Sequence, residues 1–247
     1  YLTVPSGTSG KNLPTVILVH GGPTSRDYWG YRADVQLLAS RGYAVLQVNF
    51  RGSWGYGKNF TTAGFKQWGK KMQDDITDGA TWLVDQGVAD KDKIAIFGSS
   101  YGGYSALAGV TFTPDVYACG IAYVGPSNLF TLLNNLPSYW EPEKEMLFEM
   151  IGHPVADSVL LYNASPVFHT ENIKVPLFIA QGGNDPRVRK EESEQMVDAL
   201  RSRDQHVVYM LKENEGHGFK LEENRLEFYK AMMGFLAEQM PATSIKP

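Results

Sequence analysis

The sequence predicts an α/β fold, with a mostly parallel, twisted sheet that is covered by helices on both faces. Two observations support this prediction: short apolar, β-branched runs recur along the chain, and longer segments with helical periodicity lie between them. Strands that alternate with helices are joined by crossovers, which make neighbouring strands parallel and lay the helices over the sheet. In such sheets, functional residues gather where the strands end.

The predicted strands are short and rich in Val, Ile, Leu and Phe, and they cover residues 15–19, 44–50, 93–97, 118–124, 176–180 and 206–211. The predicted helices carry apolar residues at three- and four-residue spacing, and they cover residues 31–40, 74–85, 104–111, 191–203 and 225–239. Residues 125–170 interrupt this rhythm, because five prolines stand there among aromatic and apolar residues. We expect this stretch to be a partly helical insertion over the functional site.

Length and composition predict one domain over residues 1–247, since 43% hydrophobic and 20% charged residues suffice for a full core. The net charge of −4, with interspersed signs, offers no basic face for nucleic acid. Apolar runs such as residues 177–180 are too short to span a bilayer, so we expect a soluble protein without a membrane partner. The single Cys119 has no partner for an internal disulfide and is expected to pack as an apolar residue.

A candidate nucleophile, Ser100, stands in Gly98-Ser99-Ser100-Tyr101-Gly102, directly after one predicted strand and before a predicted helix. Gly-x-Ser-x-Gly in this setting is typical of a nucleophile elbow, a turn so tight that the flanking residues must lack a Cβ. The helix that follows would present free N–H groups to the negative charge of acyl transfer. Ser99 is the rival nucleophile, but it stands off-centre between the glycines.

A serine hydroxyl needs a base, and His217 is the best placed of five histidines because it stands in a glycine-flanked loop after the last strand. His206 begins that strand, His153 and His169 belong to the insertion, and His20 closes the first strong strand. For the carboxylate that orients the base, Asp185 follows the preceding strand in a Gly/Asn/Pro loop, with Asp157 and Asp204 as fallbacks. The order Ser100, Asp185, His217 places three reactive groups at three strand ends on one edge.

Two backbone N–H groups are expected to form an oxyanion hole, one from Tyr101 and one from the loop after the first strong strand. In that loop, His20-Gly21-Gly22-Pro23, the proline has no N–H, which favours Gly22. We expect no metal, because the sequence contains no His-Glu-x-x-His, no paired cysteines and no acidic calcium loop. We expect no cofactor either, since the glycine-rich residues 52–57 lack the dinucleotide-binding register.

The chain resembles the catalytic domain of the prolyl oligopeptidase family, which has the α/β-hydrolase fold, and in particular its acylaminoacyl-peptidase and dipeptidyl-peptidase-like branch. Five motifs in the family's order support the resemblance: His20-Gly21-Gly22-Pro23, Asn49-Phe50-Arg51-Gly52-Ser53 followed by Gly55-Tyr56-Gly57, Gly98-Ser99-Ser100-Tyr101-Gly102-Gly103-Tyr104, Asn184-Asp185-Pro186-Arg187-Val188 and Glu215-Gly216-His217-Gly218-Phe219. The resemblance implies that Ser100 is the nucleophile, that Asp185 and His217 are its partners, and that the amides of Tyr101 and Gly22 form the oxyanion hole.

Members of this branch usually carry an N-terminal β-propeller that gates the site, and none precedes Tyr1 in this sequence. The resemblance therefore implies a propeller in the full-length protein, or else a stand-alone hydrolase. Some members have a tyrosine in the oxyanion hole where His20 stands here, so we expect His20 to hold the loop, with contact to substrate left open. The residues expected to bind substrate are Arg187, Val124, Tyr139, Trp140 and Phe148, each of which has an ordinary structural role as its alternative.

The predicted activity is that of a serine hydrolase that cleaves peptide or acyl-amino-acid bonds through an acyl-enzyme on Ser100. A carboxylesterase acting on small acyl esters would use the same groups, and a catalytically inactive interaction domain is a third hypothesis. The expected partner is a peptide or small acyl substrate. The sequence leaves the compartment open, with the cytoplasm slightly favoured, and it does not decide between a monomer and a homo-oligomer.

Overall fold

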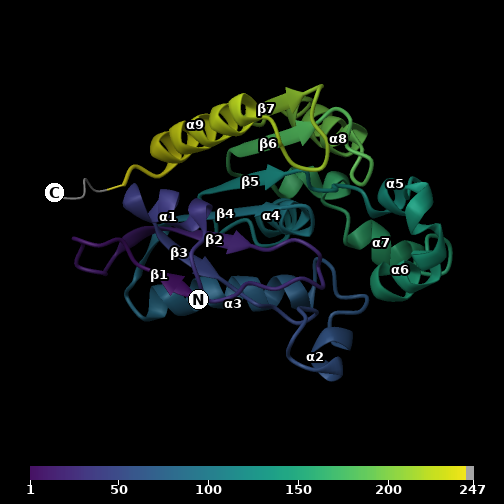
Figure 1. The fold of residues 1–247 in the computed structure, drawn as a ribbon, viewed down its shortest axis with the longest axis horizontal. Coiled ribbons are helices and arrows are strands. Elements are labelled where there is room, and N and C mark those ends of the chain that lie inside the picture. The colour runs from purple at the N-terminus through teal and green to yellow at the C-terminus, as the bar shows by residue number, and fades with distance from the viewer. Residues whose placement is uncertain (243–247) are drawn as a thin grey trace.

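The structure, a computed structural model, describes residues 1–242 and has a seven-stranded sheet at its centre (Figure 1). The strand order is β1-β3-β2-β4-β5-β6-β7, and only the β1–β3 pair is antiparallel. This arrangement confirms the predicted fold class. The strands are β1 Leu2–Thr3, β2 Leu13–Val19, β3 Ala44–Gln47, β4 Ala89–Ser99, β5 Cys119–Tyr123, β6 Leu177–Gly182 and β7 Val207–Lys212.

Helices cover both faces of the sheet, as Figure 1 shows. One face packs against α1 (Ala33–Ser40) and α9 (Glu222–Gln239). The other face packs against α3 (Lys71–Asp85), α4 (Tyr101–Phe112) and α8 (Lys190–Arg201). The central strands are buried from both sides, and none of the helices within residues 1–242 is long and apolar enough to cross a membrane.

The strand β4 shows why the sheet needs both helical layers. Its side chains point alternately to the two faces, so that Ile94 and Ile96 belong to one buried cluster while Ala95 and Phe97 belong to the other. A strand that is buried on both faces has apolar residues at consecutive positions, and for this reason the strand could be predicted from the sequence.

Element boundaries differ from the prediction where other contacts replace the regular hydrogen bonds. β3 ends at Gln47, before the expected residue 50, because Asn49 leaves the sheet and pairs with the backbone of Asp27 at 2.8 and 3.1 Å. β1 and the short helix α2 (Lys58–Thr62) were not predicted, since neither is long enough to show a period.

The segment that interrupts the alternation is largely helical. It contains α5 (Leu129–Asn134), the 3₁₀ segment η1 (Ser138–Glu143), α6 (Lys144–Ile151), α7 (Ser158–Asn163) and a second 3₁₀ segment, η2 (Pro166–Asn172). In Figure 1, α5, α6 and α7 lie beyond the ends to which the arrows of β5, β6 and β7 point. The segment therefore stands at the carboxyl edge of the sheet, where functional residues are expected.

Candidate active site

Ser100 lies in a tight turn between β4 and α4, with φ 60° and ψ −119°. A Cβ placed on Gly98 would come within 2.5 Å of the Gly102 backbone, and one on Gly102 would come within 2.1 Å of the Val19 carbonyl oxygen. Neither position can hold a side chain, so the glycines of the motif are required by backbone contact. The Ser100 amide donates to the Tyr123 carbonyl at 2.9 Å, which ties the turn to β5.

The parallel register brings the ends of five strands to one edge. Gly98 of β4 lies beside Val19 of β2 on one side and Ala122 of β5 on the other. Farther along the sheet, Gly182 of β6 lies beside Lys212 of β7. The loops that follow these strands therefore open side by side around Ser100.

Three side chains from this edge form a chain of hydrogen bonds. The Nε2 atom of His217 lies 3.0 Å from the Ser100 Oγ, and its Nδ1 atom lies 2.7 Å from the Asp185 Oδ2. The buried Asp185 carboxylate also accepts the amides of Arg187 at 2.9 Å and Val188 at 3.0 Å. With Nδ1–H donated to Asp185, Nε2 is free of its proton and can accept the serine proton.

The loop that carries His217 is held by Glu215, which belongs to one of the five motifs but was given no role from the sequence. This buried carboxylate accepts the amides of Lys220 at 2.8 Å and Leu221 at 2.9 Å, and the Asn224 Nδ2 at 2.8 Å. Burial alone would raise the pKa of Glu215, but these donors lower it overall. Glu215 thereby joins the His217 loop to the N-terminal turn of α9.

The amides of Tyr101 and Gly22, expected to form the oxyanion hole, come from two different segments that meet at Ser100. Tyr101 is the first residue of α4, and Gly22 belongs to the loop after β2. That loop runs against the turn, since a Cβ on Gly21 would lie 3.1 Å from the Ser99 carbonyl oxygen and 3.4 Å from the Ser100 Cβ. Within residues 1–242, neither amide has a hydrogen-bond acceptor, so both can bind a ligand oxygen.

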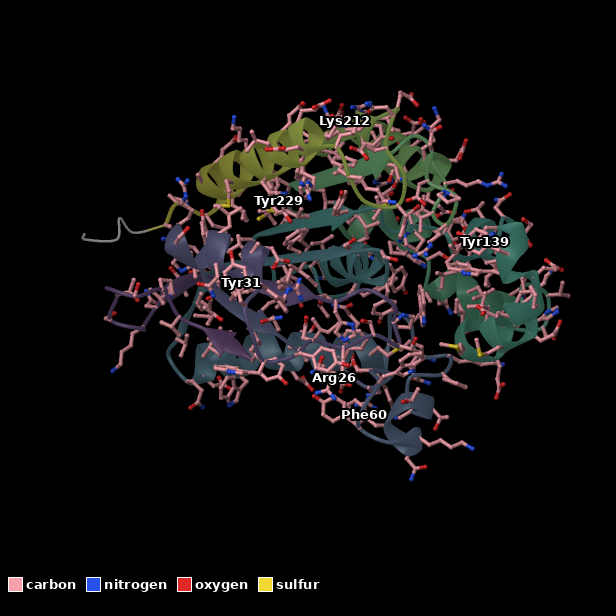
Figure 2. All side chains as sticks on the ribbon, viewed as in Figure 1. Arg26, Tyr31, Phe60, Tyr139, Lys212 and Tyr229 are labelled. Atoms are coloured by element: carbon pink, nitrogen blue, oxygen red, sulfur yellow. The ribbon has the colours of Figure 1, made fainter. Side chains whose placement is uncertain are left out.

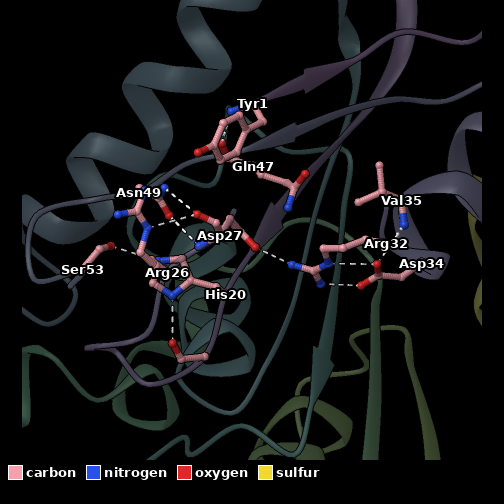
Figure 3. A network of polar contacts seen from close by, with 11 residues as sticks. Tyr1, His20, Arg26, Asp27, Arg32, Asp34, Val35, Gln47, Asn49 and Ser53 are labelled. Carbon is pink, nitrogen blue, oxygen red and sulfur yellow. Dashed lines mark hydrogen bonds and ion pairs between the residues drawn. The ribbon is translucent and has the colours of Figure 1, made fainter. Parts of the chain in front are cut away.

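His20, drawn in Figure 3, contacts the loop that carries Gly21 and Gly22. The Nδ1 atom of His20 lies 2.8 Å from the Gly21 carbonyl oxygen, its Nε2 atom lies 2.9 Å from the Ser53 Oγ, and its ring stacks on Phe50 at 4.4 Å. Burial lowers the pKa of His20. Its Nδ1 can bond to the Gly21 carbonyl oxygen only as a donor, and the Ser53 hydroxyl donates to the Phe50 carbonyl oxygen at 2.7 Å. This geometry agrees with the expectation that His20 holds the loop.

A cavity of about 60 Å³ opens beside Ser100. Its walls are mainly apolar, with Trp68 and Val188 contributing from outside the insertion. The insertion supplies the remaining large apolar side chains, which are Leu132, Leu136, Trp140, Leu147, Met150 and Ile151. The site therefore combines a polar reacting centre with an adjoining apolar pocket, as many small-molecule sites do.

Comparison with known families agrees with this geometry: a model described as the prolyl oligopeptidase family matches residues 29–243. The chain belongs to the prolyl oligopeptidase family. The resemblance seen in the motifs is thereby confirmed. Among the described side chains, no group of three or more His, Cys, Asp or Glu is placed to hold a metal ion.

Known peptidases are similar to this chain over nearly its whole length. Dipeptidyl aminopeptidase BIII of Pseudoxanthomonas mexicana is 49% identical over 96% of this chain and 36% of its own length. A solved puromycin-hydrolyzing peptidase of Mycobacterium tuberculosis is 32% identical, with a TM-score of 0.89 over 94% of this chain and 35% of that one. The Pyrococcus horikoshii acylaminoacyl peptidase is 26% identical, with a TM-score of 0.88 over 100% of this chain and 40% of that one. The chain spans about a third of the length of the curated relatives it matches.

Of the five residues expected to bind substrate in this family member, Arg187 and Trp140 line the cavity. The Arg187 guanidinium lies 5.8 Å from the Trp140 ring centroid, within cation–π range. The structure places the other three elsewhere. Val124 is fully buried, with its amide bonded to β6, and Tyr139 is 53% exposed on the outer surface of the insertion (Figure 2).

The position of Phe148 on α6 determines that its side chain does not line the cavity. It packs edge-on against His153 at 4.9 Å, on a side of α6 away from the cavity. Leu147, Met150 and Ile151 have the spacing that shares one helix face, and they line the cavity instead. That spacing is visible in the sequence, but it does not reveal what the face packs against. For Trp68, the sequence around it offers no comparable signal.

Proposed function

We propose that this domain is a serine peptidase that cleaves peptide or acyl-amino-acid bonds through an acyl-enzyme on Ser100. The single observation that supports this most directly is the hydrogen-bond chain from the Ser100 Oγ through His217 to Asp185. A hydroxyl, a base and an orienting carboxylate in this order are the groups that acyl transfer to serine requires.

In the proposed reaction, the Ser100 Oγ attacks the substrate carbonyl carbon while His217 Nε2 takes the hydroxyl proton. The amides of Tyr101 and Gly22 bind the oxygen that becomes negative, and Asp185 stabilises the imidazolium. His217 then returns the proton to the leaving amine as the C–N bond breaks. Water, activated by the same histidine, attacks the ester and releases the acid.

The cavity beside Ser100 is proposed to hold the side chain or acyl group next to the scissile bond. Its apolar walls favour an apolar group, at about 0.8 kcal/mol for each buried methylene. Arg187, at the same cavity, is proposed to bind a substrate carbonyl or carboxylate. The names of the relatives, a dipeptidyl aminopeptidase and an acylaminoacyl peptidase, support a peptide or acyl-peptide substrate.

The nucleophile is tested by fluorophosphonate labelling of folded protein, with two adjacent serines as a matched pair. Ser100→Ala is expected to abolish labelling, whereas Ser99→Ala is expected to retain it. Labelling that persists in Ser100→Ala would refute the assignment. Failure of the unaltered protein to label would favour the inactive interaction domain.

The substrate class is tested by turnover of three sets of compounds: p-nitrophenyl esters, N-acyl-amino-acid anilides and free-amine dipeptide anilides. A peptidase should cleave one of the anilide sets with a kcat comparable to that for the esters. Cleavage of the esters alone would support the carboxylesterase instead. The propeller expected from the resemblance stays a prediction, and the length of the relatives is its only support here.

A further inference from the structure

The first turn of α8 carries a buried carboxylate that the proposed reaction does not use. Glu192 is 3% exposed, and its Oε2 accepts the amides of Ser127 at 3.0 Å and Asn128 at 2.9 Å. The same oxygen accepts the Gln195 Nε2 at 3.1 Å, and the Oε1 accepts the Thr131 hydroxyl. The Ser127 hydroxyl in turn donates to the Glu192 carbonyl oxygen at 2.6 Å.

These contacts join two segments that both line the cavity beside Ser100. Ser127 and Asn128 stand between Pro126 and Leu132, which contact the cavity from the β5–α5 side. Arg187 and Val188 contact it from the loop that leads into α8. Glu192 is the side chain that accepts both backbone amides of the β5–α5 segment, which is held further by the Ser127 hydroxyl and by the Asn128 Nδ2, a donor to the Gln195 Oε1 at 3.2 Å.

The neighbouring residue of α8 has a different target. Ser193 donates to the Gln181 Oε1 at 3.0 Å, and the Gln181 Nε2 donates to the Val188 carbonyl at 2.9 Å and to the Asp185 Oδ2 at 3.4 Å. Ser193 therefore supports the loop that holds Asp185, while Glu192 supports the far wall of the cavity. Because the Gln181 amide also bonds to the cavity residue Val188, Ser193 supports the loop side of the cavity and Glu192 supports its β5–α5 side.

We propose that Glu192 is a positioning residue for substrate selectivity, whose carboxylate holds the β5–α5 segment against the Asp185 loop and so sets the width of the apolar cavity. This inference rests on the proposed role of that cavity in holding the acyl group. Without the carboxylate, two buried backbone N–H groups lose their acceptor, and the β5–α5 segment must move to find another.

The test measures kcat and KM for p-nitrophenyl esters with acyl chains from acetate to octanoate. In Glu192→Ala, the preference for the best chain over acetate is expected to fall about tenfold, mainly through KM, because a wall that moves no longer fits one chain length. Glu192→Gln is expected to keep the preference, since its Oε1 can accept both amides and its Nε2 can donate to the Thr131 hydroxyl. Ser193→Ala is expected to lower kcat for every ester and to change the preference less than Glu192→Ala does, because both amides of the β5–α5 segment keep their acceptor.

If Glu192→Ala does not fold, Thr131→Val replaces it, because this variant removes one hydrogen bond to the carboxylate and preserves side-chain shape. It should shift the preference in the same direction by a smaller factor. A wild-type preference in the Ala or Val variant would overturn the proposal, as would an equal loss in the Gln variant. Ester cleavage requires only the hydrolase chemistry of Ser100. If no anilide is cleaved, the peptidase function is refuted, but the ester series still tests the role of Glu192.

Discussion

The reacting edge of the sheet and the wall of the cavity are held in place by different means. At the reacting edge, backbone meets backbone: a Cβ on Gly102 would lie 2.1 Å from the Val19 oxygen, and one on Gly182 would lie 2.1 Å from the Gly216 oxygen. At the cavity wall, the groups that face the space are side chains such as Trp140 and Leu147. Backbone contact leaves no room for change, whereas a side-chain wall can be repacked. Substrate selectivity can therefore change without altering the reacting groups.

Two buried glutamates, one at each place, differ in the direction in which their pKa is shifted. Glu215, at the reacting edge, has its pKa lowered because donors from the α9 turn outweigh the effect of burial. Glu192, at the cavity wall, has its pKa raised because burial outweighs its donors. The donors around Glu215 therefore stabilise its negative charge next to the His217 loop. At Glu192, burial destabilises the negative charge more than the donors stabilise it.

The largest effect is expected from Gly102→Ala. The added methyl group would overlap the Val19 carbonyl, so either β2 or the turn must move, at an expected cost above about 4 kcal/mol in the free energy of unfolding. Gly234→Ala is the matched control, because nothing lies within 4 Å of that position in α9 and the helix should gain about 0.5–1 kcal/mol. Urea unfolding measures both, and a folded Gly102→Ala of normal stability would contradict the backbone argument.

Asp185→Asn is expected to lower kcat about 10⁴-fold while the fold stays intact. The amide has nearly the shape of the carboxylate, but its NH₂ group cannot accept the His217 Nδ1–H, so the histidine loses the tautomer that activates Ser100. Turnover of p-nitrophenyl acetate measures the loss, and circular dichroism verifies the fold. A fall of less than about tenfold would show that another group orients His217.

The hydrogen-bond chain that joins Ser100, His217 and Asp185 could be predicted from the sequence, because each residue stands in a motif that backbone geometry imposes. The turn at Ser100 requires glycines at positions 98 and 102 for steric reasons, and a fixed residue type at a fixed spacing is recognisable in a sequence as a motif. The strand alternation was equally visible, since β4 and its neighbours are buried on both faces. What remained uncertain was where each element ends, because that depends on contacts such as Asn49 with Asp27.

The cavity wall was predicted only in part, for a physical reason. Tyr139 and Trp140 are adjacent aromatics of equal promise in the sequence, yet one faces solvent and the other the cavity. Which one faces inward depends on how η1 packs on distant segments, and no local pattern records this. The roles of Glu192 and Glu215 were missed for a similar reason, since each bonds to backbone amides of another element.

Trp140→Ala is expected to lower kcat/KM for substrates with a large apolar acyl group by about 10- to 100-fold, with little change for acetate esters. The substitution removes both apolar area and the cation–π contact with Arg187. Tyr139→Ala, at the adjacent exposed position, should change the ratio of the two kcat/KM values less than about twofold. Equal effects of the two substitutions would show that the wall does not select the acyl group.

The smallest effect concerns His20, which lies at the reacting edge and contacts the Gly21 carbonyl oxygen, the Ser53 hydroxyl and the Phe50 ring. Because burial lowers its pKa in the folded protein below the ordinary value of 6.5, unfolding takes up a proton as the pH falls below that value. The stabilisation by neutral His20 is complete above the ordinary pKa and is lost as the pH falls through the lowered one. His20→Asn does not titrate, so its free energy of unfolding should fall less than that of the unaltered protein between pH 7.5 and pH 5. Urea unfolding at both pH values measures this difference, and parallel losses in the two proteins would mean that the ring is already charged when folded.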